Sequence, residues 1–295
     1  MAKFTKLAVA AAIASAVLVP TVSSAALINI NGVTFSPGSQ FISTTLWESV
    51  LISVSDTLSG VGRVNTIECT NNCPSPSEYG VSWMSGNNNT QLTYYFSGYS
   101  VSAWYSGITK HVSSDGDWSS NTGFAKASSI DFTGGNVKFY TDLISTGSVL
   151  NPSLPSATTV ADIENATDGA LWLEYTGVSV TESSSIGIRT GTLFSDVSGA
   201  NNVHLGGTGH GYLNVVSGSG AASSNFDTDS WMVGSVVTDA RLDSSFSTSN
   251  SGKWPLSGTA SLKTTAIPEP DSLALLGLGL AGLGVTYRWK FSKKV

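Results

Sequence analysis

Gln91-Leu-Thr-Tyr-Tyr-Phe-Ser-Gly-Tyr-Ser-Val101 is the stretch of sequence that decides the fold class. Leu92, Tyr94 and Phe96 stand two residues apart, so they share one face of an extended chain. The positions between them carry mostly hydroxyl side chains, although Tyr95 makes that second face mixed. A period of two residues predicts a β-strand.

Beyond this stretch, short runs rich in Thr, Ser, Val, Tyr and Phe alternate with turn residues. The expected strands are Leu27–Phe35, Trp47–Asp56, Gly60–Glu68, Gln91–Ser102, Asn136–Asp142, Leu171–Thr181, Ile186–Leu193, Tyr212–Val216, Asp239–Phe246 and Leu256–Thr264. Many short strands without intervening helices predict an all-β domain, an antiparallel β-sandwich or jelly roll. A parallel β-helix would show a repeat of fixed length, and none is present. Residues 157–168 form either a loop or one short helix.

The N-terminal residues are ordered like a secretory signal. Lys3 and Lys6 precede the apolar run Leu7–Val19, and small residues follow in Ser23–Ala26. A basic start, an apolar middle and a small-residue cleavage site predict a signal peptide, here a signal helix over residues 1–25. The apolar run is shorter than the roughly 20 residues that a membrane span needs.

The C-terminal residues 264–295 have three parts, and the exported domain is therefore 26–263. Pro268-Glu269-Pro270 comes first, and Ser272–Trp289 would reach about 27 Å as a helix, close to a membrane core of ~30 Å. We therefore predict one transmembrane helix over 272–289. The basic end at 288–294, which should stay on the cytoplasmic side, consists of Arg288, Lys290, Lys293 and Lys294.

This order of box, apolar span and basic end resembles the PEP-CTERM sorting tail of Gram-negative bacteria. The resemblance implies that exosortase, a membrane transpeptidase-like enzyme, recognises the tail and cuts it near Pro268-Glu269-Pro270 during export. It also implies a transient anchor in the inner membrane, contact with the secretion machinery, and delivery to the cell surface or extracellular matrix.

Composition limits the partners of the exported region. Residues 26–267 carry eight Lys/Arg and 18 Asp/Glu, a net charge of −10. Such an acidic surface argues against nucleic acid and against anionic lipid as electrostatic partners. The many tryptophans argue against a disordered chain.

Cys69 and Cys73 are the only cysteines, separated by three residues. Export places them in an oxidising compartment, so we predict that they form one disulfide bond that closes a short loop. A metal site would need further ligands, and none lies close in sequence.

Two tryptophans, Trp83 and Trp118, lie beside Gly, Asn and Ser loops and are the candidates for stacking on a glycan. Trp47, Trp104 and Trp172 lie in apolar strands and are assigned to the core. The carboxylate pairs in Asp115-Gly-Asp117 and Asp227-Thr-Asp229 are suitable oxygen ligands for calcium. They do not match a known loop spacing, so we interpret both as turns and expect no cofactor.

Catalytic motifs are lacking from the sequence. There is no Gly-x-Ser-x-Gly elbow and no His-Glu-x-x-His pattern. His204-Leu-Gly-Gly-Thr-Gly-His210 is the most suggestive cluster, and we interpret it as a glycine-rich hairpin loop. Glu48 is one of several acids that cannot be chosen as a glycosidase pair without distances.

The exported region is also similar, in short Gly-rich segments, to flocculation-associated PEP-CTERM proteins. The segments are Ser59–Val64, Leu92–Gly98 and Gly209–Val216. The similarity implies adhesion within exopolysaccharide that supports flocs or biofilm. We therefore expect a non-catalytic, exosortase-sorted matrix or surface protein. The alternatives are a discrete carbohydrate-binding module with one aromatic groove and a secreted hydrolase.

Overall fold

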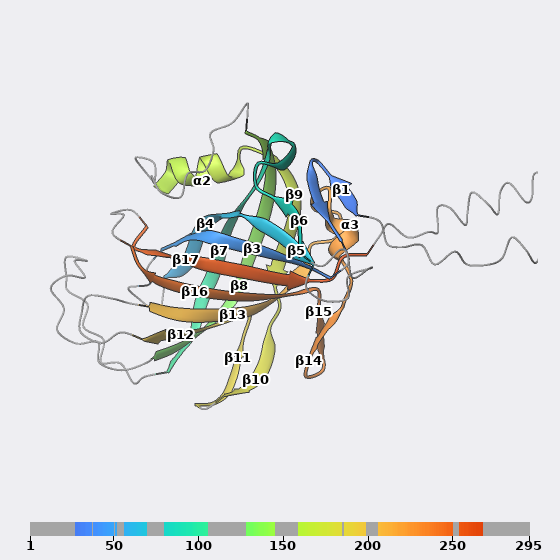
Figure 1. Ribbon diagram of the computed structural model, residues 1–295. Helices are drawn as coiled ribbons and strands as arrows, with labels where there is room; N and C mark the ends of the chain where they lie inside the picture. The colour runs from blue at the N-terminus through green and yellow to red at the C-terminus, as the bar shows by residue number, and fades with distance from the viewer. Residues whose placement is uncertain are drawn as a thin grey trace, which may run out of the picture.

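A computed structural model describes residues 27–36, 38–49, 51, 56–69, 80–105, 128–144, 159–184, 186–198, 206–249 and 254–267. Eight of its strands form one closed antiparallel ring in chain order (Figure 1). They are β3 (Ser39–Glu48), β4 (Thr57–Val64), β7 (Thr90–Tyr105), β8 (Ser128–Leu143), β12 (Leu193–Ser198), β13 (Gly206–Val215), β16 (Ala240–Thr248) and β17 (Leu256–Thr264). The last strand, β17, pairs with the first, β3, and closes the barrel.

The remaining elements extend or cover this ring. β9 (Ala170–Gly177) lies between β8 and β13, beyond the end of the shorter β12. β5 (Thr66–Cys69) continues the line of β4 along β3 and pairs with β6 (Gly80–Met84). Three hairpins and three helical segments complete the described chain: β1 (Ile28–Ile30) with β2 (Val33–Phe35), β10 (Val180–Ser184) with β11 (Gly187–Gly191), β14 (Trp231–Val233) with β15 (Val236–Thr238), η2 (Asn87–Asn89), α2 (Thr159–Thr167) and α3 (Ser223–Phe226).

The all-β class and the antiparallel pairing are confirmed, but the two packed sheets of a β-sandwich are not what the structure has. One sheet closes on itself instead, because β17 bonds to β3 from Leu256↔Glu48 to Lys263↔Gln40. Alternating inward and outward residues are required by both architectures. The period of two therefore predicts the strands without deciding how the sheet closes.

Several predicted boundaries are wrong for local reasons. The run Leu27–Phe35 is a hairpin, since Asn31 and Gly32 both have positive φ, as a type I′ turn requires. The strand expected at Trp47–Asp56 ends at Glu48 and begins at Ser39. Residues 157–168 contain α2, the helical alternative. It packs on the outside of the barrel, where Trp254 donates a hydrogen bond from Nε1 to Asp162 Oδ2 at 2.9 Å.

The interpretation of His204–His210 as a glycine-rich hairpin loop is wrong for residues 206–210, which are the part of this segment that the structure describes. Gly206–Val215 is a central barrel strand, paired with β12 and β16. A Cβ at Gly207 would lie 2.5 Å from the ring of Phe246, so that glycine makes room for the neighbouring ring. Here glycine serves close packing between strands and does not mark a turn.

Aromatic residues fill one end of the barrel. Phe35, from the β1–β2 hairpin, lies 4.8 Å from Phe226 of α3 and 5.7 Å from Trp172 of β9, measured between ring centroids. Trp172 also donates a hydrogen bond from Nε1 to the carbonyl of Ile30 at 3.1 Å. We call this end the plugged end.

A buried ion pair fixes the β10–β11 hairpin to the barrel wall. Arg189 Nε lies 2.7 Å from Asp131 Oδ1, and the two side chains are 2% and 0% exposed. Arg189 also contacts Asp196 Oδ1 at 3.1 Å and donates to the carbonyl of Ile130 at 3.2 Å. The guanidinium carbon lies 5.2 Å from the centre of the Phe194 ring.

Replacing Arg189 by Met should lower the free energy of unfolding by about 3–5 kcal/mol, because the Asp131 carboxylate would stay buried without its cation. Arg241→Met is the matched control, since Arg241 and its partner Asp243 are 40% and 30% exposed. That control should lose less than about 1 kcal/mol. Urea unfolding measures both, and equal losses would contradict a dominant role for the buried pair.

Candidate functional site

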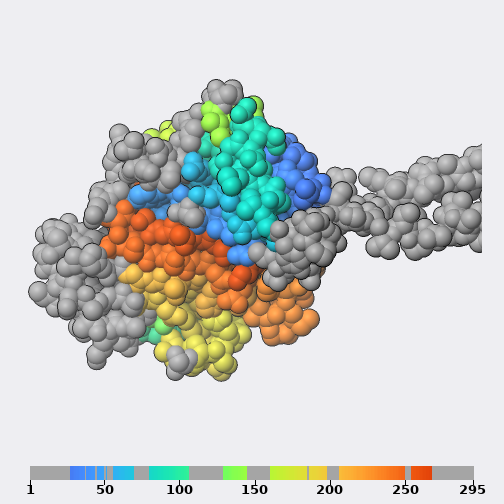
Figure 2. Space-filling model, viewed as in Figure 1, coloured from blue at the N-terminus to red at the C-terminus, as the bar shows by residue number. Residues whose placement is uncertain are grey.

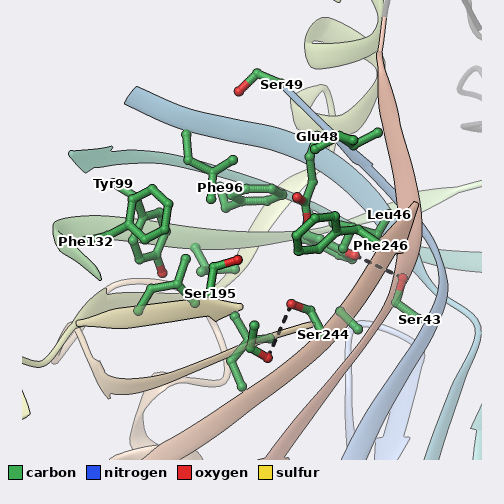
Figure 3. Close-up of a pocket in the computed structure, with 18 of the residues that line it drawn as sticks. Ser43, Leu46, Glu48, Ser49, Phe96, Tyr99, Phe132, Ser195, Ser244 and Phe246 are labelled. Carbon is green, nitrogen blue, oxygen red and sulfur yellow. Dashed lines mark hydrogen bonds between the residues drawn. The ribbon is translucent and has the colours of Figure 1, made fainter. Parts of the chain in front are cut away.

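The interior of the barrel contains a cavity of about 140 Å³. Figure 3 shows Glu48 beside Phe96 and Phe246, with Tyr99 and Phe132 across from them. The lining is mainly aliphatic and aromatic, with Glu48 and a few hydroxyl groups as its polar members. A cavity of this kind is the usual form of a small-molecule site.

Glu48 reaches this cavity because of its position in β3. It is the last residue of the strand and pairs with Gly60 on β4 and Leu256 on β17, neither of which offers a polar side chain. The ring of Phe96 occupies the space where Gly60 would carry a side chain. The two residues paired with Glu48 therefore place no polar side chain beside its carboxyl group.

The electrostatic state of Glu48 follows from this burial. The residue is only 6% exposed, and its carboxylate makes no hydrogen bond or ion pair with any described residue. Burial raises its pKa from 4.5 to about 7. Near neutral pH the carboxyl thus exchanges between a protonated donor and an ionised acceptor.

Two tyrosines lining the cavity differ in how their hydroxyls are satisfied. Tyr94 Oη lies 3.0 Å from Ser43 Oγ and 3.3 Å from the carbonyl of Thr45. Tyr99 Oη is buried and has no hydrogen-bond partner among the described residues. Burial raises the pKa of both phenols, so both stay neutral at physiological pH. Among the described residues of the lining, Tyr99 Oη is thus a buried donor without a partner, and the Glu48 carboxylate forms no hydrogen bond or ion pair.

The structure changes the assignment of the tryptophans. Trp83 is 0% exposed, so the prediction that it is available to stack on a glycan is wrong. Its ring is part of the main core, since β6 folds back on β5 and places it inside. Trp172 is buried as predicted, whereas Trp47 and Trp104 are half-buried. Trp118 lies outside the described residues.

Other predicted sites are placed as follows. Cys69 is disulfide-bonded, and Cys73, the only other cysteine in the sequence, lies outside the described residues. His210 lies on the outer surface, where its Nε2 is 3.0 Å from both carboxylate oxygens of Glu182. His111 and His204 are not among the described residues.

Of the two segments considered as calcium ligands, the one at Asp227 and Asp229 is described by the structure. Asp227 and Asp229 are exposed, and the turn between them is held by Asp239, whose Oδ1 accepts hydrogen bonds from the backbone N–H of Thr228 and Asp229 at 2.6 Å. Asp115 and Asp117 lie outside the described residues. Within the described ranges, no group of three His, Cys, Asp or Glu side chains is arranged to hold a metal ion.

The C-terminal part of the described chain joins the plugged end. Asn225 of α3 accepts a hydrogen bond at its carbonyl from Ile267 N–H at 2.8 Å, and its side-chain Nδ2 donates to the Ile267 carbonyl at 3.0 Å. Ile267 directly precedes Pro268. The folded domain is therefore hydrogen-bonded up to the residue before the box.

These residues define an all-β barrel protein with an internal apolar cavity. Residues 266–288 match the family model of the PEP-CTERM protein-sorting motif. The chain therefore carries a PEP-CTERM protein-sorting motif, and this motif implies an exported surface protein that exosortase sorts. No curated protein and no solved structure matches the chain.

Three predicted parts of the tail are not among the residues that the structure describes. The box at 268–270, the span at 272–289 and the four basic residues lie outside the described residues. Among the residues that the structure does describe, no helix has both the length and the apolar character needed to cross a membrane.

Replacing Glu48 by Gln should change how stability depends on pH. Between pH 4.5 and about 7 the folded wild-type protein holds more protons than the unfolded chain, so its free energy of unfolding falls as pH rises. From pH 5 to pH 8 this amounts to about 2–3 kcal/mol that Glu48→Gln should not lose. Urea unfolding at both pH values measures the difference.

Glu164→Gln, at an exposed position on α2, is the control for this pH experiment. It should follow the wild-type pH dependence. Parallel stability curves for wild type and Glu48→Gln would show that the buried carboxyl does not titrate as stated.

Proposed function

We propose that this protein is a non-catalytic component of the extracellular matrix, sorted by exosortase, associated with exopolysaccharide, and supporting cell aggregation in flocs or biofilm. The PEP-CTERM motif at residues 266–288 is the observation that carries the proposal. Its box follows directly on Ile267, which is hydrogen-bonded to Asn225. Cleavage there would release a barrel that retains all its strands.

The outer surface of the barrel supports association with polysaccharide. Thr208, Ser245 and Thr259 lie side by side across β13, β16 and β17, and all three are exposed. Ser245 Oγ and Thr259 Oγ1 lie 2.9 Å apart. Figure 2 shows β16 and β17, coloured orange, at the surface that faces the viewer. We call Thr208, Ser245 and Thr259 the hydroxyl row.

Hydroxyl groups in such a row can donate and accept hydrogen bonds with sugar hydroxyls. Each contact contributes little in water, so affinity would come from many contacts along a polymer. The alternative of one aromatic groove is weakened by the burial of Trp83. The hydroxyl row thus favours distributed binding over a discrete carbohydrate-binding module.

The sorting step is tested by Glu269→Gln in the box. We expect this variant to keep its tail and to remain in the membrane fraction, because exosortase would no longer recognise it. Cell fractionation and the intact mass of the product measure this. Glu164→Gln is the matched control and should be processed like the wild type. A wild-type mature mass and surface delivery for Glu269→Gln would refute dependence on the box.

The matrix role is tested by replacing the hydroxyl row with Thr208→Val, Ser245→Ala and Thr259→Val together. At about 0.5 kcal/mol for each lost hydrogen bond, binding to isolated exopolysaccharide should fall about tenfold. Co-sedimentation measures binding, and complementation of a gene deletion measures flocs and biofilm.

The matched control for the hydroxyl row is Thr181→Val with Thr190→Val. These two exposed hydroxyls lie 3.0 Å apart on the β10–β11 hairpin, away from the row. The control should bind and complement like the wild type. Undiminished binding by the triple variant, or normal flocs in the deletion strain, would overturn the matrix role.

A further inference from the structure

The cavity has an identifiable cause in the sequence. An eight-stranded barrel is just wide enough to be filled by its inward side chains or to hold one small ligand. Here a continuous row of small residues crosses five neighbouring strands on the inner face, and each member pairs with the next. The row is Ser195, Gly209, Ser244, Ala260 and Ser43. All five line the cavity.

Large side chains line the rest of the interior. Phe96, Tyr99 and Phe132 come from β7 and β8, across the barrel from the small residues. The contrast leaves a hollow along β12, β13, β16, β17 and β3. An apolar cavity of about 150 Å³ accommodates a benzene molecule. The cavity of 140 Å³ therefore fits a molecule of about one aromatic ring.

Two polar groups in this hollow, the Glu48 carboxylate and the Tyr99 hydroxyl, are available to a ligand. Tyr99 is 1% exposed, and its Oη is buried without a hydrogen-bond partner among the described residues. Glu48 is 6% exposed, and its carboxylate forms no hydrogen bond or ion pair with a described residue. A buried polar group without a partner lowers stability. A ligand that carries a hydrogen-bond donor would satisfy the carboxyl oxygen of Glu48, while its apolar part fills the hollow.

We propose that the barrel interior binds one small, mostly apolar molecule that carries a single hydroxyl or amino group, and that this group donates a hydrogen bond to Glu48. The carboxyl group of Glu48 should also exclude anionic ligands, because such a ligand would bring a second negative charge into an apolar space. This inference concerns the interior of the barrel and does not depend on the matrix role of its outer surface.

The probes for the test share one ring and differ in one group: benzyl alcohol, benzylamine, toluene and benzoate. Titration calorimetry on the mature exported protein at pH 8 measures their affinities. We expect benzyl alcohol or benzylamine to bind about tenfold more tightly than toluene, because a hydrogen bond to a charged group adds that much. Benzoate should bind more weakly than toluene.

Repeating the titrations at pH 5.5 distinguishes the two donor classes. Glu48 is then largely protonated, so a cationic amine should lose most of its advantage while an alcohol keeps its hydrogen bond. The other titratable groups of the lining are the phenols of Tyr94 and Tyr99, which stay neutral at both pH values. β4 and β17 oppose Glu48 with Gly60 and Leu256, which do not titrate.

Two variants decide whether the cavity and Glu48 are responsible. Glu48→Leu should bind toluene at least as well as wild type and lose the tenfold preference for a donor group. Ser244→Leu should fill the hollow beside Gly209 and weaken all the probes. Cooperative thermal unfolding checks that both variants fold. A preference retained in Glu48→Leu, unchanged binding to Ser244→Leu, or no binding of any probe to the wild type would overturn the proposal.

Discussion

Closure of the sheet by the pairing of β17 with β3 is the constraint on which the rest of this structure depends. This pairing joins the first and last strands of the barrel, from Leu256↔Glu48 to Lys263↔Gln40. Once the ring is closed, every second side chain of eight strands must point into one shared interior. The size of that interior is then set by strand number, and its filling by which residues occupy the inward positions. Closure thus turns one row of small residues into a cavity.

Local signals in the sequence predicted the strands and the sorting tail, since both are local properties. Leu92, Tyr94 and Phe96 alternate within one strand, and all three are buried on the inner face of β7. The Pro268-Glu269-Pro270 box needs no tertiary contact to be identified, and the family match over 266–288 agrees with it. In contrast, a choice between sandwich and barrel depends on the partner of the last strand, which periodicity does not encode.

The candidate site could not be predicted for the same reason. Glu48 faces Gly60 and Leu256, and these neighbours are fixed by pairing across the sheet. In the sequence, Glu48 follows Leu46 and Trp47 but is itself followed by Ser49, so its neighbours along the chain do not indicate burial. Trp83 shows the converse error. Its glycine- and asparagine-rich surroundings indicate exposure, but its pairing through β6 places it in the core.

The closed ring also places the start of the sorting motif and the buried carboxyl of Glu48 toward opposite ends of β17. β17 ends at Thr264, next to the plugged end, where Ile267 is hydrogen-bonded to Asn225 and the sorting motif begins. β17 starts at Leu256, opposite Glu48, so the buried carboxyl lies toward the other end of the strands. Figure 1 shows β1 and α3 at the same end of the barrel. The sorting motif therefore begins at the end that Phe35, Trp172 and Phe226 fill, and among the described residues the cavity lining extends no further along the chain than Leu262. Removal of the tail would therefore leave all eight strands of the barrel in place.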